Sequence, residues 1–193
     1  MEAPLRIAGD RVTLEAYGAP HIVELVAAVR ESAAELSAWL PWCHPAYGIR
    51  DATDWIRSCA AGWASESGYQ FAVIEVGGRF AGGLGLRVSD PQNGVASIGY
   101  WIRTSATRRG LATAAVRTAA SYAFGTLRLA RLEIFAREGN AASRRVAERA
   151  GARFECIARN RIAHHGVSHP AALYSLIPGD LATPRRASPA PPG

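Results

Sequence analysis

Hydrophobic and polar residues alternate in several short segments, and this alternation predicts β-strands. Val12 and Leu14 fall on one face of segment 11–16. Segments 70–76 and 79–87 flank Gly77-Gly78, a pair typical of a hairpin turn. Further strands are predicted at 95–102, 131–136, 153–163 and 171–177, the last two joined through His165-Gly166-Val167.

Other segments repeat their apolar residues at helical spacing. Pro20 suits a first helical turn, and apolar residues follow it at 22, 25, 26 and 29. Segment 35–42 is predicted as a short helix that Pro41 ends, and Asp51 is predicted to cap the next one. The buried face of that helix is predicted to carry Trp55, Ile56, Cys59, Ala60 and Trp63, and two more helices are predicted at 109–124 and 141–150.

The order of these elements predicts an α/β fold. Antiparallel hairpins come first, and strand–helix–strand–helix–strand follows, which favours a mixed, mostly antiparallel sheet flanked by helices. The chain contains no obvious linker, so we expect one domain over residues 9–178. Residues 1–8 are expected to be an N-terminal extension, and the Pro-, Ala- and Arg-rich residues 179–193 a disordered tail.

Composition narrows the class of protein. The chain has 193 residues, of which 49% are hydrophobic and 20% charged, as expected of a globular domain. Its three cysteines form no metal-ligand or disulfide pattern, which favours a reducing compartment, the cytoplasm. The first residues do not resemble a signal peptide, and Arg117 interrupts the longest apolar run, 112–124, so we expect no membrane span.

Charge is distributed unevenly along the chain. All 22 basic residues are Arg, a bias expected of a GC-rich bacterial genome. Residues 1–100 carry 7 Arg and 11 Asp or Glu, a net charge of −4. Residues 101–193 carry 15 Arg and 5 Asp or Glu, a net charge of +10. The second half should therefore attract anions, although a solvated basic surface or a nucleic-acid-binding module would show the same imbalance.

The strongest chemical signal is a strand that leads into a basic, glycine-containing loop and then into a helix. Arg108, Arg109 and Gly110 form the loop, and Leu111, Ala112 and Thr113 begin the helix. Free backbone N–H groups at a helix N-terminus bind anions, and glycine lets a phosphate approach the backbone closely. Asn140 then opens a second helix as a good N-cap, and Ser143 lies in its first turn.

These segments together resemble the GCN5-related N-acetyltransferase (GNAT) superfamily, in particular its RimJ/RimL branch of ribosomal-protein alanine N-acetyltransferases. The combination of RRGLAT at 108–113 with Asn140-Ala-Ala-Ser143 is specific, whereas each piece alone is weak. The similarity spans nearly all of residues 9–177, in GDRVTLEA (9–16), WLPW (39–42), DATDWI (51–56), IGYWI (98–102), RRGLATAA (108–115), LEIFAREGNAAS (132–143) and AERAGARFE (147–155).

The resemblance implies the GNAT fold, whose sheet splays between two parallel strands, here 98–102 and 132–136. It implies an acetyl-CoA-dependent N-acetyltransferase in which backbone groups of Tyr100, Trp101 and Ile102 hold the acetyl-pantetheine arm. The loop from Arg108 to Thr113 would cradle the pyrophosphate, and Asn140 would contact the cofactor. Ser143 would bind the cofactor and protonate the departing thiolate. The acceptor would be an amine, either a protein N-terminus or a small molecule.

Two positions depart from the family pattern. Thr107 stands where the phosphate loop usually begins with Gln or Arg, and Ser97 stands where many members carry Glu. Because serine alone cannot act as a base, Glu133 on the adjacent strand is the replacement candidate, and a salt bridge to an Arg on a neighbouring strand is its alternative role. A GNAT-fold protein that uses another donor, such as succinyl-CoA, or that turns over little, stays an alternative.

The acceptor site and the remaining candidates depend on weaker signals. Trp42, Tyr47, Ser97 and Tyr174 are the predicted acceptor-binding residues, with Trp42 and Tyr47 on a Pro-flanked loop. The HHGVSH segment at 164–169 fits no standard metal spacing, so no metal is expected. We expect no membrane or nucleic-acid partner, and either a monomer or a homodimer.

Overall fold

A single twisted sheet organises the chain in the computed structural model, which describes residues 5–181. Its strand order is β1-β2-β3-β4-β5-β6-β8-β7, and neighbouring strands are antiparallel except β5 and β6. The strands are β1 Arg6–Ala8, β2 Val12–Ala16, β3 Gly68–Glu75, β4 Phe80–Asp90, β5 Val95–Ile102, β6 Arg131–Arg137, β7 Arg153–His164 and β8 Val167–Leu176.

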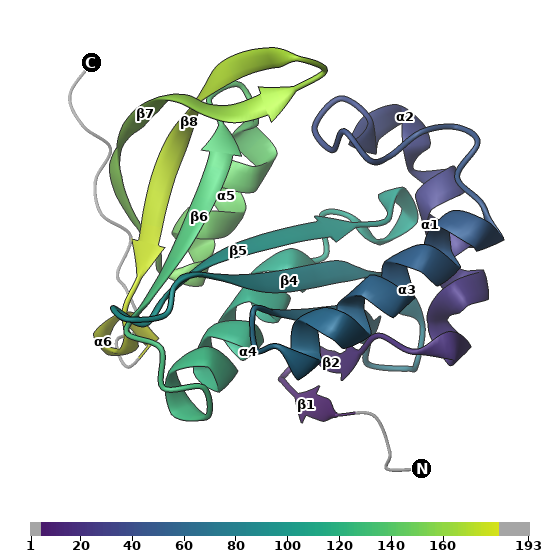
Figure 1. Cartoon of the computed structure of the whole chain (residues 1–193), viewed down its shortest axis with the longest axis horizontal. Helices are drawn as coiled ribbons and strands as arrows, with labels where there is room; N and C mark the ends of the chain where they lie inside the picture. Colours follow the sequence, from purple (N-terminus) through teal and green to yellow (C-terminus); the bar gives the residue numbers. More distant parts are fainter. Residues whose placement is uncertain (1–4, 182–193) are drawn as a thin grey trace.

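Helices cover both faces of this sheet (Figure 1). Strand alternation sends Phe71 and Val73 of β3 into the core beneath α4 and α5, and Ala72 and Ile74 into a second core beneath α1 and α3. The helices are α1 Ile22–Glu31, α2 Ala33–Leu36, α3 Ile49–Ala64, α4 Leu111–Gly125, α5 Ala141–Ala150 and α6 Pro178–Leu181, with short 3-10 turns at Ala19–His21 and Thr104–Ala106.

The two parallel strands separate after a short paired stretch. Val95–Ser97 of β5 pairs with Arg131–Glu133 of β6, and beyond Ser97 the strands diverge. Figure 1 shows β6, β8 and β7 fanning away from β5 on the side where α2 lies. The mixed, mostly antiparallel α/β fold with a splayed parallel pair is thus confirmed.

Several local expectations are corrected. Arg6–Ala8, within the expected N-terminal extension, pairs with β2 as an edge strand. Helix α3 begins at Ile49 with Gly48 as N-cap, and Asp51 instead accepts the Gly48 N–H at 2.8 Å from the third helical position. Its buried residues are Ala52 and Cys59, whereas Trp55 is 41% exposed and Ala60 is exposed. The short helix predicted at 35–42 is α2, which already ends at Leu36.

The ends of the chain add two observations. Helix α6 begins just before the expected tail and extends into it, and the rest of that tail, 182–193, lies outside the described residues. Among residues 5–181, the helices are too short or too polar to cross a membrane.

Candidate active site

The loop that precedes α4 has the backbone geometry of an anion site. Arg108 (φ 61°) and Gly110 (φ 77°) are both left-handed, and Arg109 between them is not. Within residues 5–181, the N–H groups of Arg108–Thr113 lack any intramolecular acceptor. Alternating backbone handedness turns successive N–H groups toward one concavity, and the α4 dipole adds positive potential there.

The arginine side chains of this loop have separate roles. Arg109 forms a 2.6 Å ion pair with Glu75, whose side chain is 7% exposed. The Arg109 guanidinium is thus shared with a buried carboxylate, although its side chain is 51% exposed, and its predicted place at the phosphate rests mainly on its backbone N–H. Arg108 is exposed. Sequence reasoning missed Arg11, whose Nη1 donates to the Arg109 carbonyl at 3.1 Å and would lie 3.5 Å from a Cβ on Gly110. A residue so distant from the loop in sequence gives no local signal.

The start of α5 faces strand β5 across the gap between the parallel strands. Asn140 caps the helix by accepting the Ser143 N–H at 3.0 Å, which uses its side-chain oxygen for structure. The Tyr100 hydroxyl donates to the Ser143 carbonyl at 3.0 Å and lies 3.1 Å from Ser143 Oγ. Burial raises the pKa of Tyr100 to about 12, so both hydroxyls are protonated at neutral pH. The resemblance had assigned Tyr100 only a backbone role.

Ser97 and Glu133 are partners in the last pair of the parallel ladder. Glu133 Oε1 accepts a hydrogen bond from Arg131 Nε at 2.9 Å, and Arg131 also binds Glu155 at 2.6 and 2.8 Å. The salt-bridge alternative for Glu133 is therefore present, with an Arg of the same strand rather than of a neighbouring one. The other carboxylate oxygen of Glu133 remains available to bind a water molecule or an amine.

A cavity of about 450 Å³ lies between β4, β5 and the α2–α3 region. Of the predicted acceptor residues, Trp42 and Tyr47 line it, and Tyr100 and Trp101 of β5 do so as well. Trp42 contacts Tyr47 and Trp101 with ring centroids 5.9 and 6.0 Å apart. The floor of the cavity includes Gly83 and Gly85 of β4, two glycines that can allow a ligand to approach the strand closely. Sequence reasoning missed Tyr17, Gln70 and Gly99 because they come from three separate segments.

Tyr174 does not reach this cavity. Its side chain is fully buried, and its hydroxyl donates to Glu148 at 2.9 Å and accepts from Arg144 at 3.1 Å, both on α5. The prediction that Tyr174 binds the acceptor is therefore wrong, because strand alternation turns it toward the α5 side of the sheet. Ser97 is also absent from the lining of the cavity described here.

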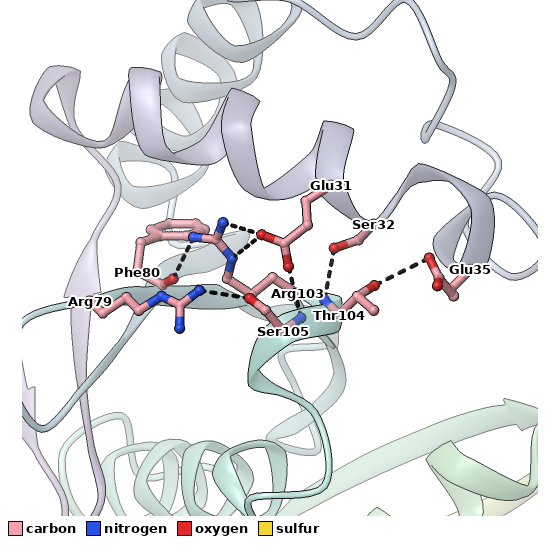
Figure 2. A network of polar contacts seen from close by, with 8 residues as sticks. All are labelled: Glu31, Ser32, Glu35, Arg79, Phe80, Arg103, Thr104 and Ser105. Atoms are coloured by element: carbon pink, nitrogen blue, oxygen red, sulfur yellow. Dashed lines mark hydrogen bonds and ion pairs between the residues drawn. The ribbon is translucent and has the colours of Figure 1, made fainter.

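A polar network joins the helices beside the cavity to the segment that leads into the phosphate loop (Figure 2). Glu31 at the end of α1 accepts hydrogen bonds from Arg103 Nε at 2.9 Å and from the Ser105 N–H at 2.8 Å. Ser32 Oγ accepts the Thr104 N–H at 2.9 Å. The hydrogen bond from Arg103 is the main reason that the pKa of Glu31 falls to about 2. The network thus fixes α1 and α2 against the exit of β5.

The described residues include three free cysteines and no cluster of metal ligands. Cys43, Cys59 and Cys156 are unpaired thiols. In the range 5–181, no three His, Cys, Asp or Glu side chains come together as ligands of an ion would.

Comparison with known proteins identifies the family. The family model described as "Acetyltransferase (GNAT) domain" matches residues 11–153. "Putative ribosomal N-acetyltransferase YdaF" of Bacillus subtilis is 33% identical over 169 residues, which are 85% of this chain and 88% of that protein. The splayed α/β sheet and its anion-binding loop are consistent with the acyltransferase class that this model describes, and the chain belongs to the GNAT acetyltransferase family.

Solved structures agree with this assignment. A GCN5-related N-acetyltransferase from Brucella melitensis is 32% identical, with a TM-score of 0.78 over 93% of this chain and 81% of that one. Mycobacterium smegmatis RimJ, solved in complex with CoA-disulfide, has a TM-score of 0.84 at 22% identity, covering 93% of this chain and 90% of that one, and so shares the fold.

Proposed function

We propose that the protein transfers the acetyl group of acetyl-CoA to a primary amine by direct attack on the thioester. The observation that carries this proposal is the pair of anion-binding loop and Tyr100–Ser143 hydroxyls, which flank the gap between β5 and β6. A pyrophosphate and a thioester at the two ends of one donor would occupy these two places.

The donor would be held mainly by backbone groups. The N–H groups of Arg108–Thr113 would bind the pyrophosphate, with Arg108 and Arg11 adding charge nearby. Beyond Ser97, the edge of β5 that faces β6 has no partner strand among the described residues. Its backbone at Tyr100–Ile102 is therefore available to pair with the amide groups of a pantetheine arm, as an added strand would.

Ser143 is the proposed proton donor to the leaving thiolate. The amine nitrogen bonds to the acetyl carbon, the carbon–sulfur bond breaks, and the thiolate sulfur takes the proton of Ser143 Oγ. Tyr100, 3.1 Å away, orients that hydroxyl and can return a proton to it. This proton transfer stabilises the thiolate charge that develops in the transition state. It therefore raises the rate of the chemical step without tightening the binding of acetyl-CoA.

The attacking amine must also lose a proton. We propose Glu133 as the group that positions the water accepting it, although Arg131 neutralises part of its charge. Glu133→Gln should then lower the rate at neutral pH. The rate of this variant should recover as the pH rises, because more of the amine is then already neutral. An equal loss of rate at all pH values would show that Glu133 acts only through its ion pair with Arg131 and does not help to deprotonate the amine.

The reaction is tested by thiol release. Acetyl-CoA with a panel of primary amines should release free CoA, and succinyl-CoA should react more slowly if the donor site is built for acetyl. CoA alone should raise the melting temperature, because it binds only the folded state. No thermal shift at millimolar CoA would contradict the proposal. We further propose a cytoplasmic location, in keeping with the three free thiols, and a monomer or homodimer.

A further inference from the structure

The cavity described above has a charge opposite to that of the molecule. The chain has a net charge of +6, yet the charged residues that line the cavity are Asp51 and Asp54, with no Arg among its described lining. Asp54 Oδ1 forms an ion pair with Arg57 Nη1 at 3.0 Å, and Asp51 Oδ1 lies 3.9 Å from His44 Nε2. Such a lining attracts a cation and repels phosphate or carboxylate groups.

The walls of the cavity are aromatic. Trp42, Tyr47, Trp55 and Trp101 line it together with Leu25 and Leu40. A volume of about 450 Å³ is that of a small-molecule site, and its aromatic walls favour a ligand with an apolar ring that packs against them.

The floor presents a group of polar atoms without partners. A Cβ on Gly83 would lie 2.6 Å from both Tyr17 Oη and Trp101 Nε1, so these two atoms converge above that glycine. The Gln70 amide occupies the same place above Gly85. Among residues 5–181, the Tyr17 hydroxyl, the Gln70 amide and the Trp101 N–H lack a hydrogen-bond partner. Burial keeps the pKa of Tyr17 well above its usual value, so its hydroxyl is a donor at neutral pH.

We infer that this cavity binds the acceptor as a compact aromatic primary amine that carries a hydrogen-bonding oxygen and no phosphate or carboxylate. This inference rests on the proposed function. The aromatic ring packs against the indole rings that line the cavity, and the oxygen of the acceptor accepts hydrogen bonds from Tyr17, Gln70 and Trp101. Gly83, Gly85 and Gly99 leave room for this arrangement because they place no side chains on the floor.

Four probe amines separate these features. Tyramine has the ring, the oxygen and the amine; 2-phenylethylamine lacks the oxygen, n-butylamine lacks the ring, and tyrosine adds a carboxylate. We expect kcat/KM for tyramine to exceed that for each of the others by about tenfold or more. Equal values for tyramine and tyrosine would overturn the charge argument. Thiol release with a free-N-terminus decapeptide but not with tyramine would overturn the inference while leaving acetyl transfer intact.

A glycine variant tests the place of binding. A Cβ on Gly99 would have no neighbour within 4 Å in the described structure, so Gly99→Ala is compatible with folding and adds a methyl group to the floor. It should raise KM for tyramine at least threefold and leave the CoA-induced thermal shift unchanged. Gly125→Ala, at the equally open end of α4, is the matched control and should change neither. An unchanged KM in Gly99→Ala would place the acceptor elsewhere.

Discussion

The two sides of the gap between β5 and β6 are built in different ways. On the α4–α5 side, most groups available to a donor are backbone N–H groups, two left-handed residues and one serine within residues 97–143, and Arg11 adds charge nearby. On the α1–α3 side, the cavity is lined by side chains from residues 17 to 101, and its charge is acidic. The first is suited to a fixed, anionic ligand, and the second to a variable, cationic one.

This difference separates what is shared from what is specific. A site made of backbone groups tolerates most side-chain changes, because the N–H groups keep their place as long as the turn is kept. In a site made of side chains, a substitution can change which ligand is preferred, because the side chains themselves make the contacts. The acceptor preference should therefore respond to mutations that leave donor binding unaltered, and the following variants test that separation.

The largest effect is expected from Gly110→Val. The left-handed φ of 77° and a branched side chain facing the anion site should together weaken CoA binding by about 100-fold. Isothermal titration with CoA measures this loss, and Gly99→Ala serves as the control on the acceptor side. If both variants lose CoA affinity equally, the two sides are not independent.

Ser143→Ala should lower kcat by about 100-fold while the dissociation constant of CoA stays within about twofold. The Asn140 cap accepts the backbone N–H of residue 143, so helix α5 keeps its first turn in this variant. Tyr100→Phe should give a smaller loss, because it removes only the group that orients Ser143. A normal kcat in Ser143→Ala would exclude the proposed proton donor.

Arg109 and Arg108 should behave differently although they are neighbours. Arg109→Ala leaves the buried Glu75 carboxylate without its partner, and we expect a loss of about 2 kcal/mol of unfolding free energy. Arg108→Ala should leave stability unchanged and weaken CoA by a few-fold, less so at high salt. Urea unfolding and CoA titration distinguish the two, and equal effects on CoA would place the Arg109 guanidinium at the phosphate as well.

The smallest effect is expected at the network that joins α1 to the exit of β5. Because the folded-state pKa of Glu31 is about 2, below its unfolded value, its stabilising contribution is present at neutral pH. It is lost as the pH falls from about 5 toward 2. Glu31→Gln should therefore remove about 1 kcal/mol at pH 7 and less than about half of that at pH 3. Thermal unfolding at both pH values checks this, and a difference independent of pH would contradict the assignment.

Local patterns in the sequence predicted the order of the elements but not all of their boundaries. The strand and helix order followed from periods of two and of about 3.6 residues, and Asn140 marked the start of α5 as predicted. Asp51 was misplaced at a helix boundary because Gly48, which can also cap a helix, stands three residues earlier. Boundaries depend on backbone geometry that neighbouring residues share, so periodicity places them only to within a turn.

Sequence by itself determined the mixed α/β architecture and the position of the donor loop, because a strand, a Gly-containing turn and a helix N-terminus are contiguous in the chain. Only the tertiary structure decided that Arg109 pairs with Glu75, that Tyr174 turns away from the acceptor, and that Tyr17, Gln70 and Trp101 meet over the β4 glycines. These contacts join residues up to 84 positions apart, as between Tyr17 and Trp101. Sheet register and helix packing set such distances, and no local pattern of residues encodes them.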